Sequence, residues 1–170
     1  MTMAQTISQC RYLLSQATAI LDGLDDSHRA LEPQPGVKTA GWLIGHLATS
    51  GDFARRLCGR PPICPVEWRA QFNPGTQPSL QSADYPPMRD LCDAFERVYR
   101  DLSDSLGGVD PKLLTIENPF AAARAGFPTS GEFVAYLMNG HLGYHLGQLV
   151  AWRAAAGARM SPARVARGAT

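Results

Sequence analysis

Four separate stretches of this chain carry apolar residues at steps of three and four, the spacing of an α-helix that buries one face. They cover residues 7–24, about 39–59, 86–108 and 129–157. No stretch shows the alternation of apolar and polar residues that a half-buried β-strand requires. The spacing therefore predicts an all-α protein built from these four helices.

Signals for helix ends flank the same stretches. Thr39 is a residue type that caps a helix N-terminus, and the Pro-Pro pair at 86–87 suits a first helical turn. The Thr-Ser-Gly-Glu sequence at 129–132 fits the capping box, in which the first and fourth residues bond each other's backbone N–H groups. The Gly-Gly pair at 107–108 is typical of a helix C-terminus. Local signals and periodicity therefore predict the same helices.

Two long connections join the predicted helices. Residues 59–85 are rich in proline and far longer than most connections in compact domains, which indicates a functional lid or a packed crossover, with one short helix at 66–72. A second irregular segment covers residues 110–128. We therefore predict a four-helix bundle with long crossover loops. It forms one domain at residues 1–158, and a basic, flexible tail follows at 159–170.

Composition narrows the function classes. Hydrophobic residues make up 45% of the chain and the formal charge is only +1, so a folded protein is expected and a nucleic-acid partner is not. No signal sequence or membrane-spanning stretch is visible, which predicts a cytoplasmic protein. The four cysteines form no CxxC pair. Cys10 and Cys92 fall on apolar helical stripes and are expected in the core, whereas Cys58 and Cys64 flank the long loop, where a reactive thiol remains open.

Three of the four histidines lie on predicted inward helix faces. His141 and His145 are four residues apart, so their side chains stack on one face among apolar neighbours. His46 lies on the apolar stripe of the second helix. Three imidazoles that converge on one divalent metal ion, with a fourth position open, match a catalytic site. The alternative is that each histidine is a hydrogen-bonded core residue, although burying three imidazoles without partners would be costly.

Other metal chemistries fit these positions less well. A zinc protease helix needs Glu directly after the first histidine, where this chain has Leu142. A di-iron carboxylate bundle needs Glu three residues before a histidine, but Met138 and Leu142 stand there. Asp52 projects from the side of its helix opposite His46 and is expected to be solvated. The predicted site is therefore mononuclear, with neutral ligands.

The segments around these histidines resemble the DinB-like superfamily, whose other branches include the bacillithiol transferases and mycothiol-dependent enzymes. The most specific element is His-Leu-Gly-Tyr-His-Leu-Gly-Gln-Leu at 141–149. Gly-Trp-Leu-Ile-Gly-His-Leu-Ala at 41–48 also matches, and residues 68–78 resemble the long loop of one branch. The resemblance covers nearly the whole chain except the last dozen residues.

The resemblance implies a bundle in which His46, His141 and His145 bind nickel, zinc or a similar ion, with cobalt and iron as alternatives, often in a homodimer. It implies transfer of a low-molecular-weight thiol onto an electrophile, or a hydrolysis. Thr49, Ser50, Tyr144 and Gln148 lie near the ligands on the same predicted faces and are candidates to orient a bound group or a ligand ring, with ordinary helix packing as the alternative.

Two functions remain open at this point. The first is a metal-dependent enzyme that acts on a small-molecule substrate. The second is a non-catalytic protein whose metal stabilises the bundle or senses ion supply. No Asp or Glu projects beside the histidines at helical spacing, so the lack of a general base weakens hydrolysis more than thiol transfer. The other side of the fourth helix carries Gly143, Gly147, Val150 and Ala154, and small residues there predict a dimer contact, with a neighbouring segment of the same chain as the alternative.

Overall fold

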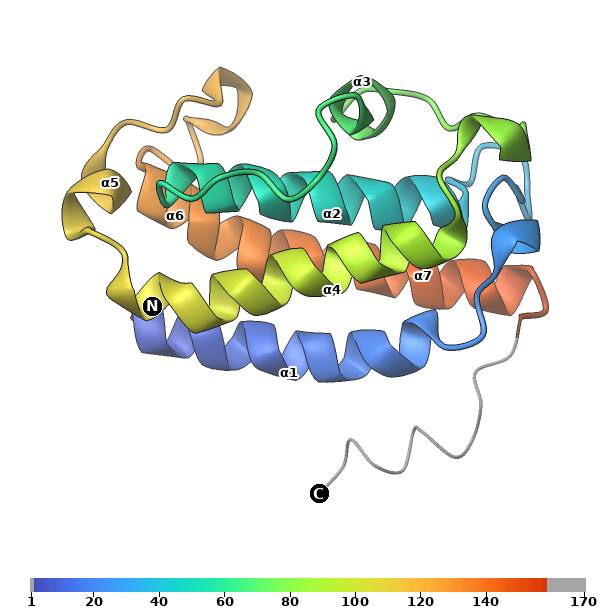
Figure 1. The fold of residues 1–170 in the computed structure, drawn as a ribbon, viewed down its shortest axis with the longest axis horizontal. Helices are drawn as coiled ribbons and strands as arrows, with labels where there is room; N and C mark the ends of the chain where they lie inside the picture. The colour runs from blue at the N-terminus through green and yellow to red at the C-terminus, as the bar shows by residue number, and fades with distance from the viewer. Residues whose placement is uncertain (1, 159–170) are drawn as a thin grey trace.

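The computed structural model describes residues 2–158 and forms an all-α four-helix bundle (Figure 1). Four long helical segments make up the bundle: α1 Met3–Leu21, α2 Ala40–Leu57, α4 Met88–Ser105, and the pair α6 Ser130–Tyr136 and α7 Leu142–Ala155. Helix α1 packs against α4 and α7, and α2 packs against the same two helices. The fold class predicted from periodicity is confirmed. The 159–170 tail lies outside the described residues, so its predicted flexibility stays a prediction.

The direction of the helices explains the length of the connection between α2 and α4. Figure 1 shows that α2 and α4 run parallel to each other and opposite to α1 and α7. Each of α2 and α4 has 18 residues, which is about 27 Å of helix. The chain must therefore travel the length of the bundle between the end of α2 and the start of α4. Residues 58–87 make this crossover, and they carry the short helix α3, Trp68–Phe72.

The predicted helix ends agree with the caps that form. The Thr39 hydroxyl accepts the backbone N–H of Trp42, and Thr129 and Glu132 bond each other's backbone N–H groups in a capping box. Pro87 lies just before the first turn of α4, as its N-cap, and the Asp26 carboxylate accepts the backbone N–H of Met88. Gly157 follows α7 with a φ of +68°, a left-handed conformation that glycine adopts without strain. These caps satisfy backbone groups that helix ends leave unpaired.

The fourth helical segment contains a wider turn that periodicity did not predict. A π-helical turn, η5 Leu137–His141, joins α6 to α7. The buried side chains Val134, Met138 and Leu142 still follow one another at steps of four through this turn. Turns of this kind occur often at functional sites because they change the local backbone without ending the helix.

Short helical pieces occupy the connections. Residues 110–128 were expected to be irregular, but they contain a short helix, α5 Pro111–Thr115. The described residues also contain single 3₁₀ turns at Asp26–His28, Ser82–Asp84, Leu106–Gly108 and Ala121–Ala123. Within residues 2–158, no helix is long and apolar enough to cross a lipid bilayer.

The crossover overturns one expectation about α2. Asp52 does project away from His46, but it is only 3% exposed and therefore not solvated. Its carboxylate accepts the backbone N–H of Ile63 at 2.6 Å and lies 3.5 Å from the Arg55 guanidinium. Arg55 also pairs with Asp101 of α4 at 2.8 Å. Asp52 is buried because the crossover passes over this face of α2, and the backbone and arginine partners compensate the burial of its charge.

Candidate metal centre

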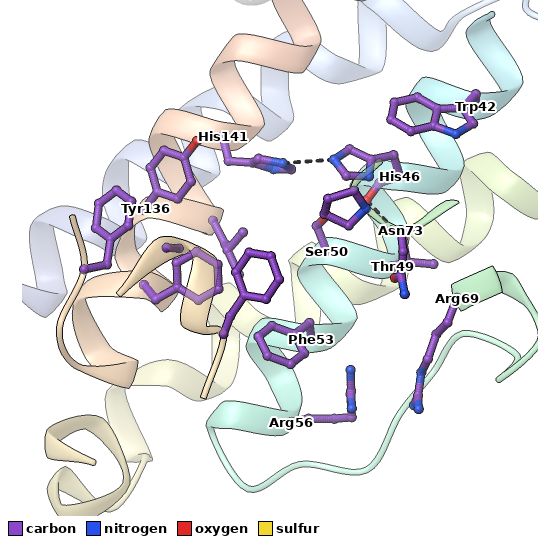
Figure 2. A pocket seen from close by; sticks show the side chains of 16 residues that line it. Trp42, His46, Thr49, Ser50, Phe53, Arg56, Arg69, Asn73, Tyr136 and His141 are labelled. Atoms are coloured by element: carbon purple, nitrogen blue, oxygen red, sulfur yellow. Dashed lines mark hydrogen bonds between the residues drawn. The ribbon is translucent and has the colours of Figure 1, made fainter. Parts of the chain in front are cut away.

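The three predicted histidines converge between α2 and the fourth helical segment. His46 lies in the middle of α2, His141 is the last residue of the π-helical turn, and His145 lies in the first turn of α7. Figure 2 shows His46 and His141 pointing toward each other across one end of a pocket. One ring nitrogen from each histidine lies within 4.8 Å of the other two. The helical faces read from the sequence therefore bring these side chains together.

His46 is held by the crossover. Its Nδ1–H donates to the backbone carbonyl oxygen of Phe72 at 2.7 Å. A carbonyl oxygen can only accept, so the proton is on Nδ1 and the lone pair of Nε2 is free. The ring also stacks on Trp42, with 4.7 Å between centroids and 9° between planes. A hydrogen bond of this kind fixes the tautomer and the orientation of a metal-binding imidazole.

Gly45 lets the crossover approach this closely. A Cβ atom at position 45 would lie 2.6 Å from the ring of Phe72, closer than atoms can pack. Phe72 is fully buried. The absence of a side chain at Gly45 therefore lets α3 lie against α2 and puts the Phe72 carbonyl in reach of His46.

His145 has a side-chain partner on its own helix. Its Nδ1–H donates to the Gln148 amide oxygen at 2.6 Å, which leaves Nε2 as the free lone pair. The amide nitrogen of Gln148 donates to the hydroxyl of Tyr144 at 3.2 Å. Of the four residues predicted to assist the ligands, Gln148 contacts a ring nitrogen directly. Tyr144 is 63% exposed, so it lies on the solvent-facing side of the helix rather than on the inward face where it was expected.

The two other predicted assistants do not reach the ring nitrogens. The hydroxyl of Thr49 donates to the carbonyl oxygens of Gly45 and His46 on its own helix. Ser50 lies one position further along and lines the pocket beside the histidines. Both residues therefore line the pocket near the cluster, but the Thr49 hydroxyl is already bonded to its own helix.

Hydrogen bonds within the protein leave one ring nitrogen of the histidine cluster without a partner. The Nε2 atoms of His46 and His141 are 3.1 Å apart. The other ring nitrogen of His141, Nδ1, is buried and has no hydrogen-bond partner among the described residues. Two nitrogens on a tetrahedral zinc ion lie about 3.4 Å apart, because each Zn–N bond is about 2.1 Å long. The 3.1 Å separation is close to this value, and a ring nitrogen of His145 lies within 4.8 Å of the other two, so the three rings are near enough to hold one ion.

Burial keeps these imidazoles neutral, the form that binds metals. Loss of solvent lowers the pKa of His46 from its ordinary value of 6.5 to about 4, although the bond to Phe72 opposes the shift. Burial, and then the charges of the other two histidines, lowers the pKa of His141 to about 3. Burial also lowers the pKa of His145. At neutral pH no proton therefore competes with a metal ion for the free lone pairs.

A pocket of about 570 Å³ opens beside the cluster, and His46 and His141 line one end of it (Figure 2). Its volume lies within the usual range for small-molecule sites. Trp42, Phe53, Phe127 and Phe133 contribute aromatic wall, and Arg56 and Arg69 contribute positive charge at the other end. None of the described residues that line it is an aspartate or a glutamate.

Several of these residues were not found by sequence reasoning. The Phe72 carbonyl belongs to the backbone, which sequence patterns do not reveal. Phe127 and Arg69 come from connections whose paths helical periodicity does not describe. Arg56 could have been found, because it follows His46 by ten residues and Phe53 by three, which puts all three on one helix face.

Comparison with known proteins assigns the family. A family model described as the DinB superfamily matches residues 9–149, which include all three histidines of the cluster. Searches of curated proteins and of solved structures found no match. The family match covers most of the chain, and the buried histidine triad and the helical bundle agree with it. The chain therefore belongs to the DinB superfamily.

Proposed function

We propose that the chain is a metal-dependent enzyme that transfers a low-molecular-weight thiol onto an electrophilic small molecule. The observation that carries this proposal is the position of the histidine cluster at the end of a pocket of about 570 Å³. A structural metal site is closed by protein ligands, whereas a catalytic site keeps a position open for substrate. Here His46 and His141 border a space that is large enough for a substrate.

His46, His141 and His145 would hold the ion through their Nε2 atoms. Phe72 and Gln148 keep two of these rings in the tautomer that presents Nε2. A bound divalent ion lowers the pKa of a thiol or a water molecule and so supplies a nucleophile near neutral pH. Three neutral imidazoles suit zinc and nickel, and also cobalt and iron, so the donor set does not select one metal.

The residues around the pocket favour thiol transfer over hydrolysis. A hydrolase needs a group that takes a proton from water, and no described carboxylate lines this pocket. A thiol ionises several pH units below water and needs less help from a base. Ser50 and Thr49 line the pocket near the cluster, and we expect the Ser50 hydroxyl to orient a bound substrate. The aromatic wall excludes water from the electrophile.

Metal content is the first test. Tag-free protein is analysed by mass spectrometry after incubation with zinc or nickel, beside the His145→Ala variant. His28→Ala is the matched control, because His28 is the one remaining histidine of the chain and lies in the first connection, on a 3₁₀ turn. We expect about one ion per chain in the parent and the control, and loss of the ion in His145→Ala. No metal in the parent would refute the proposal.

The catalytic claim needs a second measurement. Metal-loaded protein is assayed for consumption of free thiol in the presence of a chloroaromatic electrophile, and the rate is compared with that of chelator-treated protein. Enzyme function predicts that the chelated protein stays folded by circular dichroism and loses the thiol-transfer rate. If removal of metal unfolds the bundle and the loaded protein shows no turnover, the metal is structural and the enzyme proposal fails.

A further inference from the structure

The pocket has one long floor, formed by a single face of α2. From His46 onward, five residues of α2 line the pocket. The first is His46 itself, and the others come three, four, seven and ten residues after it: Thr49, Ser50, Phe53 and Arg56. These steps put them on one helical face. Ten residues of helix span about 15 Å. Figure 2 shows the histidines at one end of this floor and the arginines at the other.

The middle of the pocket is aromatic. Phe53 packs edge-on against Phe120 and Phe133, with centroids 6.5 Å and 6.1 Å away. Phe127 stacks on Tyr136 with 4.3 Å between centroids. A wall of this kind favours an apolar or aromatic ligand body, because few polar atoms there can replace lost water contacts.

One buried asparagine holds two of these rings in place. Asn118 is fully buried. Its side-chain oxygen accepts the backbone N–H of Phe120, and its side-chain nitrogen donates to the carbonyl oxygen of Phe127, each at 3.0 Å. The loop wall is therefore fixed by specific hydrogen bonds, as a preformed binding pocket requires.

The far end of the pocket carries two arginines, and the Arg56 guanidinium lies over the Phe53 ring, 4.9 Å from its centroid. Arg56 comes from α2 and Arg69 from α3, and neither makes an ion pair with a carboxylate in the described part of the chain. The Nε atom of Arg56 is buried and has no hydrogen-bond partner. Burial, followed by the charge of Arg69, lowers the pKa of the Arg56 guanidinium. Two like charges side by side in a pocket are costly unless an anion joins them.

Two other arginines near the end of α2 do pair with a carboxylate. Arg55 is 4% exposed and binds Asp101, which Arg60 also holds through two bonds of 2.8 Å. Arg55 and Arg60, which lie away from the pocket, are therefore paired with a carboxylate. Arg56 and Arg69, which line the pocket, are not.

We propose that this pocket binds an organic anion with an apolar or aromatic body, whose carboxylate, sulfonate or phosphate group lies on Arg56 and Arg69. Its other end then points along the α2 floor toward the three histidines. Guanidinium groups donate to oxyanions in pairs, which gives both affinity and orientation. The anion site stands on the arginines alone, whereas the claim that the bound molecule is the substrate rests on the proposed function.

Two dyes with the same skeleton test the anion site. Anilinonaphthalene sulfonate is an aromatic anion, and N-phenyl-naphthylamine is the same molecule without the sulfonate. Binding of each is measured by fluorescence titration with metal-free and zinc-loaded protein, and the ratio of the two dissociation constants gives the preference for the anion. We expect the sulfonate to bind more tightly, with one dye per chain.

Substitution of the arginines should remove that preference. In Arg56→Gln/Arg69→Gln we expect the affinity for the sulfonate to fall by about tenfold or more, with little change for the neutral dye. Arg56→Lys/Arg69→Lys keeps the charges and should retain most of the preference. Arg89→Gln is the control, because Arg89 lies on α4 with a side chain that is 88% exposed. Circular dichroism checks that each variant is folded.

The outcomes separate this inference from the proposed function. An equal preference for the anion in the parent and in the double Gln variant would overturn the inference, as would tighter binding of the neutral dye by the parent. His145→Ala should lose metal but keep the preference for the sulfonate. A protein that binds no metal and still prefers the anion through its arginines would refute the metal enzyme and leave the anion site standing.

Discussion

Gly45→Ala tests how the crossover controls the histidine cluster. The new methyl group would lie 2.6 Å from the Phe72 ring, so either the ring or the whole of α3 must move. Both are tightly packed, since Phe72 is fully buried. Overpacking of this kind costs about 1–3 kcal/mol. Movement of α3 would also lengthen the 2.7 Å bond from His46 to the Phe72 carbonyl.

Gly147→Ala is the matched control. Gly147 lies inside α7, and a Cβ atom there would meet nothing within 4 Å. Both substitutions gain helix propensity, about 1 kcal/mol each. The difference in the free energy of unfolding between the two variants therefore isolates the clash, and we expect Gly45→Ala to be less stable by about 1–3 kcal/mol. Denaturant unfolding of metal-free protein measures this difference, with Val150→Glu added to both variants because Gly147 lies on the predicted dimer strip.

The metal affinity should follow the same order. Loss of a hydrogen bond to a ligand ring lowers metal affinity by about tenfold or more, so zinc should bind more weakly to Gly45→Ala than to Gly147→Ala in chelator competition. In the Phe72→Ala background the methyl group at position 45 has room, and Gly45→Ala should then be stabilising. Equal stability and equal zinc affinity of the two single variants would refute this account of the crossover.

Three further predictions concern acid, thiols and assembly. The three cluster histidines have pKa values below the ordinary 6.5. As the pH falls, these histidines are therefore protonated at a higher pH in the unfolded chain than in the folded protein. The free energy of unfolding of metal-free protein should fall as the pH drops from 6.5 toward 4, and a flat profile would contradict the burial of the rings. Burial raises the pKa of Cys58 to about 11 and those of the other three cysteines to about 12, so Ellman's reagent should react with native protein about a hundredfold more slowly than with unfolded protein. One fast native thiol would contradict this. The homodimer stays a prediction, because Gly147 and Val150 of the α7 strip are open whereas a Cβ atom at Gly143 would meet Leu13 of α1. Light scattering should show Val150→Glu shifting a dimer to monomer, and a parent that is monomeric at high concentration rules the dimer out.

Helical periodicity was sufficient for the bundle and for the convergence of the histidines. His141 and His145 share a face because they are four residues apart, and the π-helical turn ends before that spacing is affected. The partner of His145 was also within reach of sequence reasoning, since Gln148 follows it by one turn on the same helix. Local rules therefore account for the residues whose relative positions depend on one helix.

Residues outside the helices were harder to predict for physical reasons. The burial of Asp52 depends on a crossover that lies over it, and helix faces alone could not place that segment. Cys58 and Cys64 are buried for the same reason, although they flank a loop. The aromatic wall depends on the buried hydrogen bonds of Asn118, which nothing in the sequence distinguishes from a surface turn. Long-range packing decides these positions.

The topology of the bundle explains why the pocket lies where it does. Because α2 and α4 run parallel, the crossover between them must pass along the bundle, and it carries Arg69 and Phe72 over the face of α2. The connection that leads to α6 supplies Phe120 and Phe127 from the other side. The histidines thus lie on the long helical segments, as do Phe53 and Arg56, whereas Arg69, Phe120 and Phe127 of the pocket wall belong to the connections. Loops tolerate substitution better than packed helices, so changes at Arg69, Phe120 and Phe127 should alter which anion binds without disturbing the histidine cluster.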